Sequence, residues 1–274
     1  LTDVKPMHCK KVFIEMDADY SGSTIRQAYI AMGTMLKAAK MNDLISKHPM
    51  DGVRFTKPVR AANDIKFLTR EEQRIFLETA RRSHNYNQYA LILETGLRTG
   101  ELIGLTWDCV DFENEVIYVE KQLVQTRKKG QKHRFGTLKN GKTRVIAPAP
   151  YIMQVLKKHK IAQAEQRLLM GDLWNPGEFP NLVFTHKDGS HYSQPTIWKE
   201  FQDILAAAGL EHHRVHDLRD TFAVNSIMAG DDIKTLQENM GHYSAAFTLD
   251  RYGHVTETMR RESSNRMQAF IENM

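Results

Sequence analysis

Strand-forming residues are concentrated in one short block of this chain, and this limits its fold more than any other feature. The run Val116–Val119 is β-branched and aromatic, which is typical of a strand. Residues 134–137 and 143–146 predict two further strands, and the Asn140-Gly141 pair between them is a strong hairpin signal. A chain of 274 residues with so little strand sequence must build its core largely from helices. We therefore expect a mainly α fold with a small antiparallel β-sheet, of the α+β class.

Helical patterns flank the strand block on both sides. Thr69 and Glu72 form a capping-box pattern that starts a helix with apolar residues through Ala80. Further helices are expected over residues 86–94, 151–169, 194–208 and 232–240, and over a segment that begins near His216. One more short strand is expected at residues 182–184.

Composition divides the chain into two predicted domains. Residues 1–57 indicate a small helical domain, with one helix capped by Ser23 and a short helix over residues 41–47. Residues 58–67 are the expected linker, and residues 68–274 form the second domain.

The last segment of the second domain, residues 255–274, carries an apolar stripe at helical spacing. Such an amphipathic helix must bury its stripe on its own domain or on a second copy of the chain. We favour the second copy, which implies a homo-oligomer with this helix exchanged between protomers.

Composition also indicates a protein that acts in a reducing compartment. No apolar run approaches the roughly 20 residues that span a bilayer, and the first residues lack the pattern of a signal peptide. Cys9 and Cys109 are too few for a disulfide framework. We therefore expect a cytoplasmic protein with no membrane partner.

Positive charge is concentrated in one part of the sequence. The formal net charge of +5 decides little by itself. Between Glu120 and Glu165, however, there is no acidic residue, while lysine and arginine are frequent. This stretch is either a solvated basic face or a surface for the phosphate backbone of DNA. On the second interpretation the DNA-binding residues are Arg127, Lys128, Lys129, Lys132, Arg134, Lys142, Arg144 and, further along, Arg214.

Residues that suit phosphate chemistry recur through the second domain. His216 and Arg219 are three residues apart, so on a helix they project from one face and reach the same small anion. Arg98 lies between two glycines that allow a tight turn, and Lys139 lies beside the Asn-Gly turn. The full candidate set is Arg98, Lys139, His216, Arg219, His242 and Tyr252.

This set suits phosphoryl transfer through a covalent intermediate. The two arginines can each donate two hydrogen bonds to the non-bridging oxygens of a phosphodiester, and His242 can add a third contact. Tyr252 is the candidate nucleophile; a phenol has a pKa of about 10 and needs a proton acceptor, for which His216 is the candidate. Lys139 can supply a proton to the departing sugar oxygen.

Each of these residues also has an ordinary structural interpretation. The six could be a core histidine, a helix-end capping residue, a half-buried aromatic ring and exposed cations. A metal nuclease that uses His212, His213 and His216 is a further alternative, but no carboxylate cluster accompanies these histidines. The joint occurrence of the set favours phosphoryl transfer through a covalent intermediate over attack by metal-activated water.

The motifs resemble those of the tyrosine recombinases, also called phage-type integrases. The resemblance runs from Leu68 to about Ile271 and rests on Thr95-Gly96-Leu97-Arg98-Thr99-Gly100-Glu101, Lys139, His216-Asp217-Leu218-Arg219, Gly241-His242 and Tyr252. It implies the tyrosine recombinase catalytic fold, in which the other five candidates activate a DNA phosphate and Tyr252 becomes joined to the 3′ phosphate. Because that bond stores the energy for rejoining, the resemblance also implies that no metal and no cofactor is required. The segment Phe247–His254 is most similar to integrases of conjugative transposons from Gram-positive bacteria.

The resemblance also implies a role and partners. The role is to integrate and excise a mobile element in a bacterium, acting on double-stranded DNA at the element ends and the target site. Residues 1–57 resemble the latter half of the family's helical core-binding domain, which clamps DNA; its earlier helices are not expected in this chain. Asp220 departs from the family, where many relatives carry histidine, and we expect this to have a structural effect only.

Two alternatives stay open at this point. If residues 1–57, as a shortened core-binding domain, cannot assemble into a clamp on DNA, the chain is a DNA-binding or excision-regulating module without turnover. A type IB topoisomerase shares the chemistry but relaxes DNA without a preference for a site.

Overall fold

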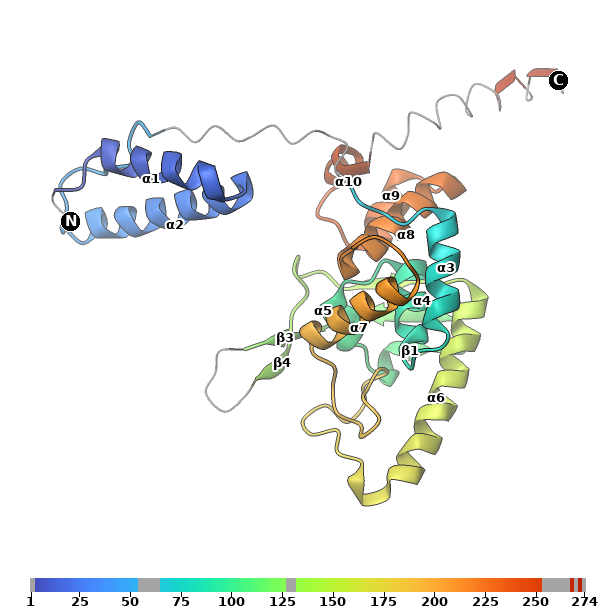
Figure 1. Cartoon of the computed structure of the whole chain (residues 1–274). Coiled ribbons are helices and arrows are strands. Elements are labelled where there is room, and N and C mark those ends of the chain that lie inside the picture. Colours follow the sequence, from blue (N-terminus) through green and yellow to red (C-terminus); the bar gives the residue numbers. More distant parts are fainter. Residues whose placement is uncertain (1–2, 54–64, 127–131, 253–266, 269–270, 273–274) are drawn as a thin grey trace. The chain divides into compact units, whose positions relative to one another are not determined.

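The computed structural model describes residues 3–53, 65–126, 132–252, 267–268 and 271–272 (Figure 1). The chain separates into two units, Leu1–Ala61 and Ala62–Met274, and each has its own core. The domain boundaries expected at residues 57 and 68 stay predictions, because most of the residues between them lie outside the described ranges. No helix within those ranges is both long enough and apolar enough to cross a bilayer.

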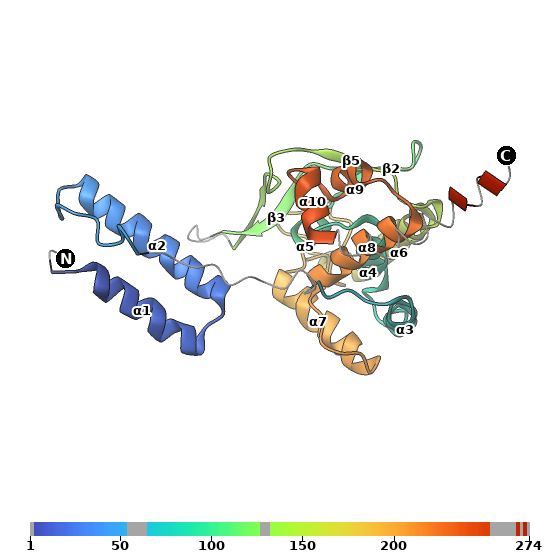
Figure 2. The same cartoon turned by 90° about the horizontal axis from the view of Figure 1, so that it is seen from above.

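The first unit is a pair of helices, α1 (Pro6–Asp19) and α2 (Gly22–Met41), which lie side by side (Figures 1 and 2). The cap of α2 is Ser21, two residues before the predicted cap Ser23; its Oγ accepts a hydrogen bond from the backbone N–H of Thr24 at 3.4 Å. A small core joins the helices to the turns that follow, and it consists of Cys9, Leu36, Ala39, Ile45, Met50 and Val53.

Two features of the first unit differ from the sequence predictions. The sequence pattern does not predict α1, because Cys9 is its one buried residue and its apolar period is weak. The predicted short helix over residues 41–47 is wrong. The α2 helix ends at Met41, and Asp43 has a φ of 55°, in the left-handed region, so the chain turns there.

The second unit is built around α4 (Tyr86–Thr95) and α8 (Val215–Ala229), which pack against each other. Around these two lie α3 (Arg70–Ala80), α6 (Pro150–Met170) and α7 (Gln194–Ala207), together with the short helices α5 (Thr99–Ile103), Trp107–Cys109 and Gly171–Leu173. The predicted capping box of α3 is confirmed, since the backbone N–H of Thr69 donates to Glu72 Oε2 at 2.7 Å.

The strands form two small antiparallel sheets. One has the order β1 (Val110–Asp111), β2 (Val116–Val119) and β5 (Arg144–Ile146). The other pairs β3 (Gln122–Gln125) with β4 (His133–Gly136), and it projects from the side of the unit (Figure 1). The predicted class, mainly helical with a minor antiparallel β component, is confirmed.

The pairing of these strands differs from the predicted hairpin. The turn itself forms, because the N–H of Gly141 donates to the carbonyl of Leu138 at 2.9 Å and Gly141 has a φ of 68°. The strands on its two sides belong to different sheets, since β5 buries Ile146 opposite Ile117 while β4 pairs with β3. The strand predicted at residues 182–184 is reduced to a single bridge at Leu182.

Three helices complete the second unit: α8, α9 (Ile233–Met240) and α10 (Ala245–Tyr252). The side chain of Asp232 caps α9, and α9 packs against both neighbours. Together they bury a separate apolar cluster, which consists of Ala223, Val224, Ile227, Leu236, Met240 and Tyr252. The helix predicted over residues 255–274 lies almost entirely outside the described residues, so its packing stays a prediction.

Candidate active site

A cavity of about 460 Å³ opens in the second unit where the ends of several elements meet. It is lined by Arg98, Lys139, Asn140, His216, Arg219, Gly241, His242, Tyr243, Phe247 and Arg251. Five of the six side chains that the sequence marks for phosphate chemistry therefore come together. The sixth, Tyr252, does not line the cavity.

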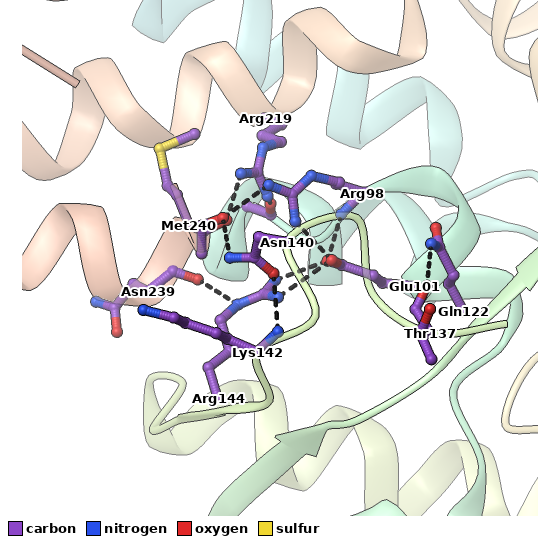
Figure 3. Close-up of polar contacts among 12 residues, drawn as sticks. Arg98, Glu101, Gln122, Thr137, Asn140, Lys142, Arg144, Arg219, Asn239 and Met240 are labelled. Carbon is purple, nitrogen blue, oxygen red and sulfur yellow. Dashed lines mark hydrogen bonds and ion pairs between the residues drawn. The ribbon is translucent and has the colours of Figure 1, made fainter. Parts of the chain in front are cut away.

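Arg98 is held at the cavity by the buried carboxylate of Glu101 (Figure 3). Gly96 ends α4 in the left-handed region with a φ of 61°, and Arg98 then precedes α5. Arg98 donates from Nη1 to Glu101 Oε1 at 2.7 Å and from Nη2 to the carbonyl of Gly241 at 2.9 Å. Arg98 thus ties the start of α5 to the end of α9.

Arg144 approaches the same carboxylate from β5. Its Nη2 and Nη1 donate to the two oxygens of Glu101 at 2.6 and 3.1 Å, and its Nε donates to the carbonyl of Asn239 at 2.8 Å (Figure 3). Burial by itself raises the pKa of Glu101, but the hydrogen bonds and charge of Arg144, together with Arg98, outweigh it and lower the pKa to about 2. Glu101 is therefore an ionised counter-ion shared by two arginines.

The surroundings of Arg144 differ from those of an exposed DNA-binding side chain. Its side chain is only 8% exposed, and all three of its guanidinium nitrogens donate within the protein. It is therefore part of the frame that supports Arg98, and its predicted contact with DNA stays a prediction. The sequence shows it as one more cation in a basic stretch, because its partner lies 43 positions away.

Arg219 is almost completely buried, with 2% of its surface exposed. Its Nη1 donates to the carbonyl of Gly96, and its Nη2 donates to the carbonyl of Met240 (Figure 3). These carbonyls lie at the C-terminal ends of α4 and α9, where the helix dipoles favour a cation. Burial, followed by the charge of Arg98, lowers the pKa of Arg219 to about 9, so the group stays cationic at neutral pH.

The two histidines of the cavity lose basicity in this cationic setting. Burial and the charges of Arg219 and Arg98 lower the pKa of His242 to about 3, so its ring is neutral near pH 7. Its Nδ1 lies 2.9 Å from the Oγ1 of Thr248 in α10. Desolvation also lowers the pKa of His216, although the charge of Asp220 opposes the shift. Neutral imidazoles can donate through one nitrogen and accept through the other.

Tyr252 is withdrawn from the cavity and is 1% exposed. Its Oη donates to Asp220 Oδ1 at 2.6 Å, so the hydroxyl is held by a carboxylate and not by His216, the acceptor expected from the sequence. Arg251 donates to the same carboxylate, from Nη2 to Oδ2 at 2.8 Å. Burial and the negative charge of Asp220 raise the pKa of Tyr252, which disfavours the phenolate.

The remaining predicted DNA-binding residues have varied surroundings. Those with exposed side chains are Lys132, Arg134 and Lys142. The side chain of Arg214 is 60% exposed, but its guanidinium pairs with buried Asp217 at 2.6 Å. Three others lie outside the described residues, namely Arg127, Lys128 and Lys129.

No group of three or more histidine, cysteine, aspartate or glutamate side chains is placed to hold a metal ion within the part of the chain that the structure describes. His213, a ligand in the metal-nuclease alternative, is buried with its Nδ1 3.8 Å from Asp217 Oδ2. That alternative gains no support from the structure.

Three charged residues shape the site although sequence reasoning gives them no role in it: Glu101, Asp220 and Arg251. Glu101 stands three residues after Arg98 at a helix start, a spacing that allows the two to pair. The pairing of Arg98 with Glu101 could therefore have been predicted from the sequence. Asp220 carries no comparable signal, because its partner Tyr252 is 32 positions away.

Comparison with known proteins identifies the family of this chain. Residues 66–259 match the phage integrase family. Two curated relatives are 27% identical to this chain: a XerC-like tyrosine recombinase of Caldanaerobacter subterraneus subsp. tengcongensis and the transposase from transposon Tn916 of Enterococcus faecalis. The matches cover 86% and 93% of this chain but 63% and 64% of those proteins, so the chain spans less than two thirds of their length.

A solved structure has the same fold. It is that of the Tn1549 transposon integrase in complex with a circular intermediate DNA, which is 23% identical to this chain. The similarity covers 97% of this chain and 86% of that one, with a TM-score of 0.76. The predicted tyrosine recombinase fold is therefore confirmed. Because the family match extends over most of the second unit and includes every residue of the cavity, the chain belongs to the phage integrase family.

Proposed function

We propose that this protein is a site-specific DNA recombinase that cuts and rejoins DNA through a 3′-phosphotyrosyl intermediate on Tyr252, and so integrates and excises a mobile element. One observation carries the proposal: Arg98, Lys139, His216, Arg219 and His242 surround one cavity although they are scattered along the chain. Membership of the family supports it, as does the likeness to an integrase solved with DNA.

The cavity suits the charge of a phosphodiester. Arg98 and Arg219 are fixed by buried partners, so they need little rearrangement to bind non-bridging oxygens. A guanidinium has five N–H donors, and the bonds of Arg219 to Gly96 and Met240 leave others for an oxygen of the substrate. The negative charge that grows in the transition state is then met by groups already in place.

The strand-transfer step follows from this arrangement. The Tyr252 oxygen attacks phosphorus, the bond from phosphorus to the 5′ oxygen breaks, and the phenol proton passes to a base such as His216. Lys139, exposed on its turn, protonates the 5′ oxygen as it leaves. Reversal by the 5′ hydroxyl of a second strand rejoins DNA, since the phosphotyrosine preserves the energy of the broken bond.

The partner in this proposal is double-stranded DNA, at the element ends and at the target site. Exposed Lys132, Arg134 and Lys142 support it, because lysine and arginine on a surface neutralise backbone phosphates. We further propose that several copies act together on DNA in the bacterial cytoplasm, with the segment 255–274 exchanged between them.

A nicked duplex of an element end, which traps the covalent complex, tests the reaction. The wild-type protein should form an adduct that survives denaturing electrophoresis, and Tyr252→Phe should form none while it still binds the duplex. An adduct that persists in the Phe variant would refute Tyr252 as the nucleophile.

The burial of Tyr252 favours a second candidate, a DNA-binding or excision-regulating module without turnover. It predicts tight binding of the same duplex with no adduct from the wild-type protein. Relaxation of an unrelated supercoiled plasmid would instead indicate the topoisomerase-like activity, which needs no specific site.

A further inference from the structure

The carboxylate of Asp220 joins the candidate nucleophile to the wall of the cavity. Asp220 is completely buried in α8, and it accepts hydrogen bonds both from Tyr252 and from Arg251. Arg251 also lines the cavity, and its side chain is 32% exposed. One guanidinium therefore faces the carboxylate on one side and the expected position of a DNA phosphate on the other.

We propose that Asp220 is a positioning residue that holds Tyr252 away from the cavity until a DNA phosphate draws Arg251 off it. We name Asp220, Arg251 and Tyr252 together the Asp220 latch. The inference rests on the proposed function and adds to it a step that precedes the chemistry.

The closed latch disfavours attack for two reasons. The Tyr252 oxygen donates its proton to a carboxylate at 2.6 Å, so an anionic phosphate that approached it would be repelled by Asp220. The ring is also buried in the apolar cluster of α8, α9 and α10. The distance to be covered is short, however, because the ring lies parallel to that of His242 with 6.3 Å between centroids.

A phosphate in the cavity would weaken the latch through Arg251. A planar guanidinium that binds a carboxylate through two nitrogens suits a phosphate equally well, and the two anions compete for it. Arg251 and Tyr252 are consecutive residues at the end of α10, so a move of Arg251 toward a phosphate would also pull Tyr252 away from Asp220. Entry of DNA and release of the nucleophile are thereby coupled.

Asp220→Asn tests the latch, since it keeps the shape of the side chain and removes its charge. Adduct formation on the nicked duplex, measured in a single turnover at saturating protein, should accelerate about tenfold, as expected when a charged hydrogen bond becomes a neutral one. DNA affinity should rise as well, because Arg251 no longer has to leave a carboxylate in order to bind the phosphate. Asp232→Asn is the matched control: it makes the same substitution at the exposed cap of α9, outside the cavity, where asparagine also caps well.

A second measurement does not depend on activity. With 3-fluorotyrosine placed at position 252, the H2O/D2O isotope shift of the fluorine signal should be small in the wild-type protein and large in Asp220→Asn. In a Lys139→Ala background, which slows cleavage, the duplex should produce the same large shift with Asp220 intact.

The outcomes separate the two proposals. A fluorine signal that stays buried both in Asp220→Asn and on saturation with the duplex overturns the latch, as does a variant that forms adduct no faster than the wild type. If no protein forms an adduct, the proposed function fails, and the fluorine signal alone then decides the latch. If Asp220→Asn does not fold, the fluorine signal of the protein with Asp220 intact, measured with and without the duplex, decides whether the latch exists.

Discussion

Glu101 and Asp220 are both buried carboxylates of the second unit, and each accepts hydrogen bonds from charged partners on other elements. Glu101 fixes Arg98 at the wall of the cavity and is itself held by Arg144. Asp220 instead holds the hydroxyl of Tyr252 inside the protein. One buried acid thus keeps an arginine in place at the cavity, and the other keeps the candidate nucleophile Tyr252 away from it.

The largest expected effect is on the free energy of unfolding, and it concerns Glu101. Glu101→Gln removes the charge that compensates Arg98 and Arg144, and loss of one partner from a buried ion pair typically destabilises by about 3–5 kcal/mol. Urea denaturation should report the lower free energy of unfolding. Glu238→Gln is the control, because Glu238 pairs with Lys234 on the surface and should matter little. Equal losses in the two variants would show that Glu101 is not a structural counter-ion.

A smaller effect concerns His242, which lines the cavity and has its ring parallel to that of Tyr252. Its pKa falls from 6.5 to about 3 in the folded protein, so between these values the unfolded chain binds more protons. The free energy of unfolding should therefore fall as pH drops below 6.5, and His242 should contribute about 2 kcal/mol of that fall by pH 5.

His242→Gln removes this titration, and its unfolding free energy should depend less on pH over the same interval. His212→Gln, at an exposed position, is the control and should follow the wild-type curve. Parallel curves for His242→Gln and the wild type would mean that the folded protein does not suppress protonation of this ring.

The smallest expected effect distinguishes exposed Lys142 from buried Arg144, two cations that the sequence alone does not separate. Lys142→Gln should leave stability unchanged and reduce the slope of log Kd against log salt by about 1, as expected for one lost phosphate contact. Fluorescence anisotropy with a duplex at several salt concentrations measures this slope. Lys158→Gln, exposed on α6, should leave it unchanged, and a similar change there would show that Lys142 has no special contact with DNA.

Local signals in the sequence account for much of the fold. The capping box of Thr69 and Glu72 and the glycine after α9 depend on neighbouring residues, and both mark real helix ends. The turn at Asn140-Gly141 is real for the same reason. Which strands flank it in a sheet depends instead on burial across the unit, so β4 and β5 do not pair with each other as the local signal suggests.

The candidate site likewise contains some residues whose position could be predicted from the sequence and others whose position could not. Spacing on one helix face brings His216 and Arg219 together, and both line the cavity. The anchoring of Arg144 and the position of Tyr252 could not be predicted, because each depends on a carboxylate more than thirty positions away. Their roles in catalysis and DNA binding stay proposals.

Arg219 has a consequence for insertions into the second unit. Because one guanidinium fastens the carbonyls of Gly96 and Met240, the last turns of α4 and α9 form a single block with the residues that follow them. An insertion that altered the register of either helix would displace Arg98 and His242 together.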